Sequence, residues 1–256
     1  MNKQEMKDFV SKAHHELFTL HDTSALKRYF SDHFIEHSPL VADGLAGLSQ
    51  LVQDCPNLKH EAIRVLADGD LVAIHGRFVG LDEHALIGFD IYRVDDGKIV
   101  EHWDGLVAEA VPNTSGRTQL DGIATVVSNG QEEKNRKTVT SFFKKALIEG
   151  HYDAFKEYTE GGFFLQHSPD IGDGVTAVID FLNKIRNEGQ GLVYFKTHRT
   201  IADGQFVLTH SEGSIAGERH AYFELWRVDH DKIVELWDAI LPVPEDQQAV
   251  HPYGIF

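Results

Sequence analysis

The sequence predicts an α+β protein made of two successive copies of one small domain, each with three N-terminal helices packed on a curved antiparallel sheet. The main observation is an internal repeat: residues 89–104 (FDIYRVDDGKIVEHWD) and 223–238 (FELWRVDHDKIVELWD) are identical at ten of sixteen positions. Two shorter blocks agree with it, 37–44 with 167–174 and 66–69 with 201–204. The offsets of 130 to 135 residues indicate a tandem duplication with small loop insertions.

Hydrophobic periodicity gives the same order of elements in each copy. Helices are expected at 3–20, 24–30 and from 43 onward in the first copy, and at 133–149, 153–159 and 175–187 in the second. Strands are expected at 60–67, 71–79, 86–94 and 99–107, and again at 192–202, 206–215, 220–228 and 232–241.

The domain boundaries follow from the repeat. Residues 1–110 form the first predicted domain and residues 132–256 the second. The segment 111–131 between them is rich in Pro, Ser, Gly and Asn and shows no repeat partner, so it is interpreted as a linker.

Composition limits the function classes. With 40 acidic and 24 basic residues, the net charge of −16 argues against nucleic acid or an anionic membrane as a partner. The single cysteine, Cys55, allows no disulfide within the chain and fits a reducing compartment. No apolar run is long enough for a membrane span, so a soluble, cytoplasmic protein is expected.

The last hairpin of each copy predicts which side chains face the interior. Val94 to Lys98 suits a type I turn followed by Gly97 in the left-handed conformation, which would pair Val94 with Lys98. One face of the hairpin then carries Asp90, Tyr92, Val100, His102, Asp104 and Leu106, and the other carries Phe89, Arg93, Ile99, Glu101 and Trp103. The first face in the second copy carries Glu224, Trp226, Val234, Leu236, Asp238 and Ile240. That face is apolar apart from its carboxylates and is therefore predicted to be interior. A two-residue turn would instead move Asp90 and Glu224 outward.

Carboxylates and a histidine on an apolar concave surface are candidates for general acid/base chemistry, because desolvation shifts the pKa values of both toward neutrality. The candidates of this kind are Asp90, His102 and Asp104 in the first copy and Glu224 and Asp238 in the second. The expected ligand-binding residues on the same surface are Tyr92, His75, Trp226 and His210. For each residue the alternative is a structural role.

His37 and His167 each precede a Ser-Pro step and are expected at the mouth of the interior. A Zn²⁺ site from His37, His75, His102 and Asp104 is an alternative, but no two of these residues form a His-x-His or His-x₃-His pair, so no metal is predicted. No cofactor is predicted either, since a Gly-rich phosphate loop is missing from the sequence.

The motifs HSP…DG, [L/I]ADG and DIYRVDDGKIVEHWD, with ELWDAILPVPE at 235–245, resemble the SnoaL-like subgroup of the NTF2-like superfamily. The resemblance implies a cone-shaped pocket and, in some relatives, cofactor-free chemistry on small hydrophobic carbonyl compounds. SnoaL-type cyclases catalyse an aldol condensation with an acidic residue as general acid/base. Asp104 and Asp238 match the carboxylate of the subgroup's His-Trp-Asp motif.

Ketosteroid isomerases, more distant relatives, place a carboxylate base at the position of His37 and a carboxylic acid donor at that of Asp90. The resemblance thus implies His37 and His167 as candidate bases and Asp90 and Glu224 as candidate acids. Leu236 in place of His102 puts the activity of the second copy in doubt.

Relatives commonly dimerise through the outer faces of their sheets. The resemblance therefore implies an intramolecular pseudo-dimer, with Phe89, Trp103, Phe223 and Trp237 on the contacting faces. Three functions stay open: an enzyme that carries out aldol-type cyclisation or isomerisation, a non-catalytic binder of a hydrophobic metabolite, and a protein-interaction module. The sequence leaves the substrate and any further oligomerisation undetermined.

Overall fold

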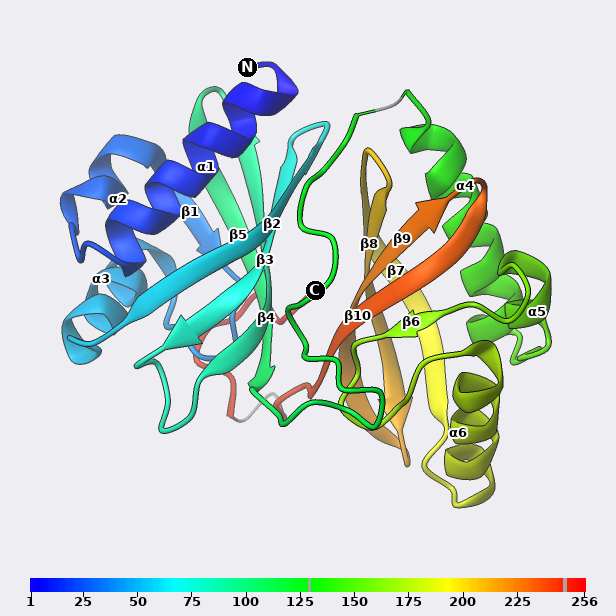
Figure 1. The fold of residues 1–256 in the computed structure, drawn as a ribbon. Coiled ribbons are helices and arrows are strands. Elements are labelled where there is room, and N and C mark those ends of the chain that lie inside the picture. Colours follow the sequence, from blue (N-terminus) through cyan, green and yellow to red (C-terminus); the bar gives the residue numbers. More distant parts are fainter. Residues whose placement is uncertain (129, 246–247) are drawn as a thin grey trace. The chain divides into compact units, whose positions relative to one another are not determined.

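The computed structural model describes residues 1–128, 130–245 and 248–256, so one position of the expected linker, residue 129, lies outside it. Contacts divide the chain into unit 1, residues 1–109 with 243–256, and unit 2, residues 110–242. Each unit combines helices with one five-stranded sheet, which confirms the α+β class (Figure 1). Among the described helices, none is both long enough and apolar enough to cross a membrane.

Unit 1 contains the three expected helices and one strand more than expected. Its elements are α1 (Lys3–Phe18), α2 (Ser24–Tyr29), β1 (Phe30–Glu36), α3 (Gly44–Asp54), β2 (Lys59–Asp68), β3 (Leu71–Val79), β4 (Leu86–Asp95) and β5 (Lys98–Ala108). The strand order is β1-β5-β4-β3-β2, and only β1 pairs in parallel. The prediction of four strands missed β1, because its partner β5 is distant in sequence and no hairpin turn marks the pairing.

Unit 2 repeats this order. Its elements are α4 (Glu132–Phe143), a π-helical turn (Lys144–Ile148), α5 (Ala154–Tyr158), β6 (Leu165–Gln166), α6 (Val175–Asn187), β7 (Leu192–Asp203), β8 (Phe206–Ile215), β9 (Glu218–Asp229) and β10 (Lys232–Pro242). The sheet order β6-β10-β9-β8-β7 matches that of unit 1, with the short β6 again parallel to its neighbour.

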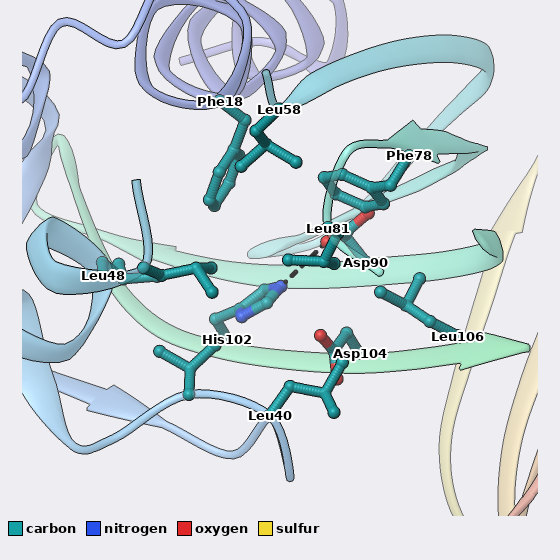
Figure 2. Close-up of a pocket in the computed structure, with 12 residues that line it drawn as sticks. Phe18, Leu40, Leu48, Leu58, Phe78, Leu81, Asp90, His102, Asp104 and Leu106 are labelled. Carbon is teal, nitrogen blue, oxygen red and sulfur yellow. Dashed lines mark hydrogen bonds and ion pairs between the residues drawn. The ribbon is translucent and has the colours of Figure 1, made fainter. Parts of the chain in front are cut away.

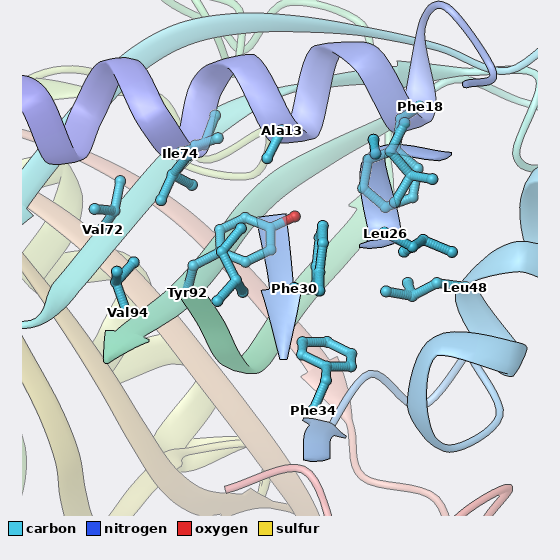
Figure 3. Close-up of a cluster of buried hydrophobic side chains, with 14 of the residues drawn as sticks. Ala13, Phe18, Leu26, Phe30, Phe34, Leu48, Val72, Ile74, Tyr92 and Val94 are labelled. Atoms are coloured by element: carbon cyan, nitrogen blue, oxygen red, sulfur yellow. The ribbon is translucent and has the colours of Figure 1, made fainter. Parts of the chain in front are cut away.

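The core of unit 1 lies where the helices cover one face of its sheet. Asn2 and Glu5 form a capping box that starts α1, and the helix then buries one apolar stripe. Figure 3 shows Ala13 and Phe18 of α1 over strand residues such as Ile74 and Tyr92. Burying such side chains is the dominant favourable term in folding. The site described below lies beside this core.

The turn between β4 and β5 differs from the expected one. Asp96 and Gly97 both have positive φ, 43° and 73°, which makes a two-residue turn that pairs Asp95 with Lys98. A bulge follows at Val100, because Val94 pairs with Ile99 while Arg93 pairs with Glu101.

The bulge restores the predicted faces farther along the hairpin. Asp90 pairs with Asp104, and Tyr92 pairs with His102, so all four side chains share one face although the predicted pairings were wrong. Near the turn the prediction fails: Ile99 belongs to the core and Val100 does not. In unit 2, His230 and Asp231 form the same turn, and Glu224 pairs with Asp238.

The segments that follow the two sheets resemble each other, contrary to the expectation that 111–131 has no repeat partner. Val-Pro at 111–112 and Gly-Ile at 122–123 recur at 243–244 and 254–255. The first segment belongs to unit 2 and the second to unit 1, whereas the sequence analysis assigned 243–256 to the second domain. Each one supplies a carbonyl to a histidine: Thr118 to His167, and Gly254 to His37.

Candidate functional site

A small cavity lies between the helices and the concave face of the sheet in unit 1 (Figure 2). Its space for water-sized molecules is about 20 Å³, room for roughly one water. The lining is Phe18, Leu40, Val41, Leu48, Leu51, Leu58, Phe78, Leu81, Asp90, His102, Asp104 and Leu106. Three ionisable side chains therefore meet in an otherwise apolar cavity.

His102 is held between two carboxylates. Its Nδ1 lies 2.8 Å from Oε1 of Glu36, and its Nε2 lies 3.1 Å from Oδ1 of Asp90. Both carboxylates accept these bonds at once only when the ring carries a proton on each nitrogen. Burial lowers the pKa of His102, but Glu36 and Asp90 outweigh burial and raise that pKa well above its usual value. The ring is therefore an imidazolium at neutral pH.

Asp104 is the cavity carboxyl poised to exchange a proton. Burial raises the pKa of Asp104 to about 7. The nearby His102 lowers this pKa, whereas the carboxylates of Glu36 and Asp90 raise it further. The hydroxyl of Ser38 donates to Oδ2 of Asp104 at 2.8 Å. Oδ1 is buried and has no hydrogen-bond partner within the described residues. One oxygen is thus fixed while the other stays available.

Sequence reasoning missed Glu36, although it is fully buried and central to the site. It ends the unpredicted strand β1, whose parallel pairing sets Glu36 opposite His102. The repeat contained one signal. Gln166 of unit 2 corresponds to Glu36 and Leu236 corresponds to His102, so both charged residues are replaced by uncharged ones. The two substitutions remove a buried cation together with a buried anion.

Tyr92 faces the interior as predicted. Its ring stacks on His102 at 4.5 Å between centroids, and its hydroxyl lies 2.7 Å from Nδ1 of His14 on α1. His14 in turn packs edge-on against His60 of β2, 4.2 Å between ring centroids. These two histidines bring further polar atoms to the buried side of Asp90.

His37 and His167 do not join the cavity groups. The ring of His37 stacks on Trp103 of the outer face, its Nε2 lies 2.9 Å from Glu101, and its Nδ1 lies 2.8 Å from the carbonyl of Gly254. His167 repeats this arrangement on Trp237, with bonds to Glu235 and to Thr118. Both rings are occupied by structural partners, which fits the structural alternative for these residues.

His75 and His210 also lie on the outer faces, contrary to expectation. The β3–β4 register pairs Ile74 with Asp90 and His75 with Phe89, so Ile74 rather than His75 points inward. His75 stacks on Phe89 at 4.5 Å, and His210 stacks on Phe223 at 4.1 Å. The prediction failed because mid-strand position alone does not decide the face.

The interior of unit 2 is built from larger aromatic side chains. Phe143 packs against Tyr194 and Trp226, and the Tyr194 hydroxyl donates to Glu224 at 2.9 Å. Burial raises the pKa of Glu224 to about 8. Burial likewise raises the pKa of Asp238 to about 7. The carboxyls predicted for this interior are present, but its histidine is replaced by Leu236.

Residues 12–102 match the model of a SnoaL-like domain. A SnoaL-like protein of unknown function from Burkholderia thailandensis is 20% identical, with a TM-score of 0.37, covering 42% of this chain and 100% of the other. A candidate polyketide cyclase from Bacillus cereus is 23% identical, with a TM-score of 0.34 and coverages of 38% and 70%.

IdmH from Streptomyces antibioticus, a candidate polyketide cyclase, is 21% identical, with a TM-score of 0.34 and coverages of 40% and 91%. No curated protein matches the chain. The family model covers Asp90 and His102 but ends before Asp104. The stretch that matches the SnoaL-like domain model lies within unit 1.

Proposed function

We propose that unit 1 binds a small hydrophobic carbonyl compound and moves a proton on it by general acid/base catalysis, in an isomerisation or aldol-type cyclisation. The observation that carries the proposal is the state of Asp104. One oxygen is held by Ser38, the other has no partner among the described residues, and the pKa of the carboxyl is raised to about 7. A group with a pKa near the working pH serves as both acid and base.

The proton has a defined place on Asp104. Because Ser38 donates to Oδ2, the proton of the neutral acid resides on Oδ1. In its carboxylate form, Oδ1 takes a proton from the carbon next to the ligand carbonyl. In its acid form, the same oxygen returns the proton to that carbon or, when the ligand is a β,γ-unsaturated ketone, to its γ-carbon, which completes an isomerisation. This proton transfer needs no cofactor.

His102 supplies the charge that favours the enolate. Its imidazolium lines the cavity, and in a buried site a fixed cation stabilises developing negative charge more strongly than it would in water. Glu36 and Asp90 hold the ring and keep it protonated. In this proposal Glu36 and Asp90 are positioning residues, and Asp104 is the catalytic residue.

The size of the cavity limits the ligand. About 20 Å³ admits a water, so a ketone must displace side chains of the lining. Leu40 and Leu81 belong to the loops 37–43 and 80–85, and Leu40 is 53% exposed. We infer that a ligand enters by displacing these two side chains, which favours small, apolar ketones.

The test is exchange of α-protons in D₂O, followed by proton NMR with cyclohexanone and 1-tetralone as probes. The wild type should accelerate exchange, and Asp104→Asn should lose about 10²- to 10⁴-fold of that acceleration. Asp238→Asn in unit 2 is the matched control and should exchange like the wild type. Wild-type exchange no faster than in buffer with either probe, or equal rates for wild type and Asp104→Asn, would reject the proposal.

A non-catalytic binding or interaction module is the alternative, and the narrow cavity favours it. Binding of 1-tetralone without exchange would support the binder, whereas no binding to either unit would support the interaction module.

The matching strand orders support a tandem duplication. The intramolecular pseudo-dimer, a cytoplasmic location, and the exclusion of nucleic acid and membrane as partners stay predictions.

A further inference from the structure

We propose that His14, His60 and Asp90 bind a divalent transition-metal ion, with Zn²⁺ as the reference ion, on the buried side of the unit 1 sheet. This site goes beyond the proton transfer proposed for Asp104. The sequence predicted no metal, and the ligands it offered for one were His37, His75, His102 and Asp104. None of these residues belongs to the site proposed here.

The three side chains come from different elements and converge. His14 lies on α1, His60 on β2 and Asp90 on β4. One ligand atom of each, a ring nitrogen or a carboxylate oxygen, lies within 4.8 Å of the other two. The sequence separations hid this cluster, since no two of the residues form a short metal-binding motif.

The atoms at the centre of the cluster are short of partners. Nε2 of His14, Nε2 of His60 and Oδ2 of Asp90 are all buried, and none has a hydrogen-bond partner among the residues covered by the structure. His14 and Asp90 are 3% and 2% exposed. A buried polar atom without a hydrogen-bond partner destabilises the folded state. A metal ion bound by the three residues would give these atoms a partner.

Their chemistry suits a transition metal. Two imidazole nitrogens and one carboxylate oxygen form a common ligand set for Zn²⁺ and leave one position open. Zn²⁺ binds the neutral form of a histidine ring, and Nε2 of both His14 and His60 has no hydrogen-bond partner among the described residues. Tetrahedral Zn²⁺ sets its ligand atoms about 3.3 Å apart, so the side chains close slightly around the ion.

The surroundings also orient the ligands. With a metal on Nε2, the Nδ1 proton of His14 is donated to the hydroxyl of Tyr92, 2.7 Å away. Oδ1 of Asp90 accepts from His102 while Oδ2 turns to the metal. Metal ligands are typically held by second partners of this kind. The side chain of His60 is half-buried, whereas its Nε2 is buried.

Unit 2 shows that the fold does not need these groups. Residue 194 aligns with residue 60 and residue 226 with residue 92, so Phe143, which packs on both Tyr194 and Trp226, takes the place of His14. Glu224 replaces Asp90 and accepts from Tyr194. The two residues of unit 2 that replace His14 and His60 provide test substitutions suited to such an interior.

The test titrates chelator-stripped full-length protein with Zn²⁺ by calorimetry, and with Co²⁺ by visible absorption. We expect saturation at one ion per chain for the wild type and loss of that ion in both His14→Phe and His60→Tyr. Tyr92→Phe should weaken binding by about 10- to 100-fold, because it removes only the partner of His14. Circular dichroism confirms folding, and if His14→Phe fails to fold, His60→Tyr and Asp90→Asn decide.

His15→Phe is the matched control, because His15 is exposed on the same helix, and it should bind like the wild type. No stoichiometric Zn²⁺ in the wild type would overturn the proposal. Equal Zn²⁺ binding by His60→Tyr, Asp90→Asn and wild type would also overturn it, as it would show adventitious binding by surface histidines. Neither readout depends on proton exchange, so the two proposals fail separately.

Discussion

The two units have the same strand order, but the side chains in their interiors differ in charge. In unit 1, the positions of Glu36 and His102 hold a buried ion pair, with Asp90 as second partner of the ring. In unit 2 the matching residues are Gln166, Leu236 and Glu224. Since both interiors support the same strand order, the charged cluster is not a requirement of the fold. A buried charged cluster that the fold does not require is a candidate for a functional site.

The outer faces of the two sheets, in contrast, carry nearly the same side chains in both units. His37 with Glu101 and Arg93 matches His167 with Glu235 and Arg227, with the ring stacked on a tryptophan in each case. Because each of these histidines has the same structural partners in its unit, we interpret the group as part of the scaffold. The contrast between interior and outer face is therefore testable by substitution.

The largest effect is expected from breaking the buried ion pair on one side. His102→Leu leaves the carboxylates of Glu36 and Asp90 buried without their cation, which costs about 3–5 kcal/mol of unfolding free energy. Leu236→Ala in unit 2 is the comparison for simple loss of packing. Urea unfolding at pH 7 measures both, and an effect of His102→Leu below about 1 kcal/mol would contradict the prediction, because it would show that loss of the cation leaves no costly buried charge.

Glu224 should make unit 2 sensitive to pH. Its pKa in the fold is about 8 against an ordinary 4.5, so the unfolded chain releases this proton first as pH rises. Stability from this group is full below pH 4.5, falls by about 1.4 kcal/mol per pH unit and levels off above pH 8. Tyr194 and Asp238 are the polar groups beside it.

Glu224→Gln removes that titration and keeps an acceptor for Tyr194. The variant should therefore gain stability relative to the wild type as pH rises from 5 to 8, measured by thermal unfolding at each pH. Parallel curves for the two proteins would contradict the raised pKa.

The smallest effect is expected on the outer face. His37→Gln breaks the bonds to Glu101 and Gly254 and should lower the unfolding free energy by about 1–3 kcal/mol. It should leave any α-proton exchange within about twofold of wild type, because His37 lies away from the cavity. A large loss of exchange in a folded His37→Gln would restore the role that the family resemblance implied for this residue.

Prediction from sequence succeeded where the signal is local. The helices and the eight hairpin strands follow from periodicity and turns, and the facing of Asp90, His102 and Asp104 is right. It failed where distant segments meet. Strand β1, and with it Glu36, depends on parallel pairing with β5. The convergence of His14 and His60 on Asp90 depends on how α1 crosses the sheet, which no residue pattern encodes.

The positions of two histidines differ from the prediction for a related reason. A proline corner and a mid-strand position are compatible with either face of a sheet, so His37 was expected at the mouth of the interior and His75 on its inner surface, whereas both lie against the outer face. The bulge at Val100 compensates for two wrong predictions. The turn type and the strand pairing both differ from those expected, yet Asp90 still faces the interior.

The central claim is that the charged cluster of unit 1 serves function rather than folding. Its most direct test is the unfolding free energy of Glu36→Gln/Asp90→Asn/His102→Leu, which gives unit 1 an uncharged cluster like that of unit 2. Replacing a buried ion cluster as a whole is often neutral or stabilising by about 1–4 kcal/mol. We predict a stability at pH 7 equal to or above that of the wild type. A triple variant as unstable as His102→Leu alone would contradict the claim and make the cluster part of the scaffold.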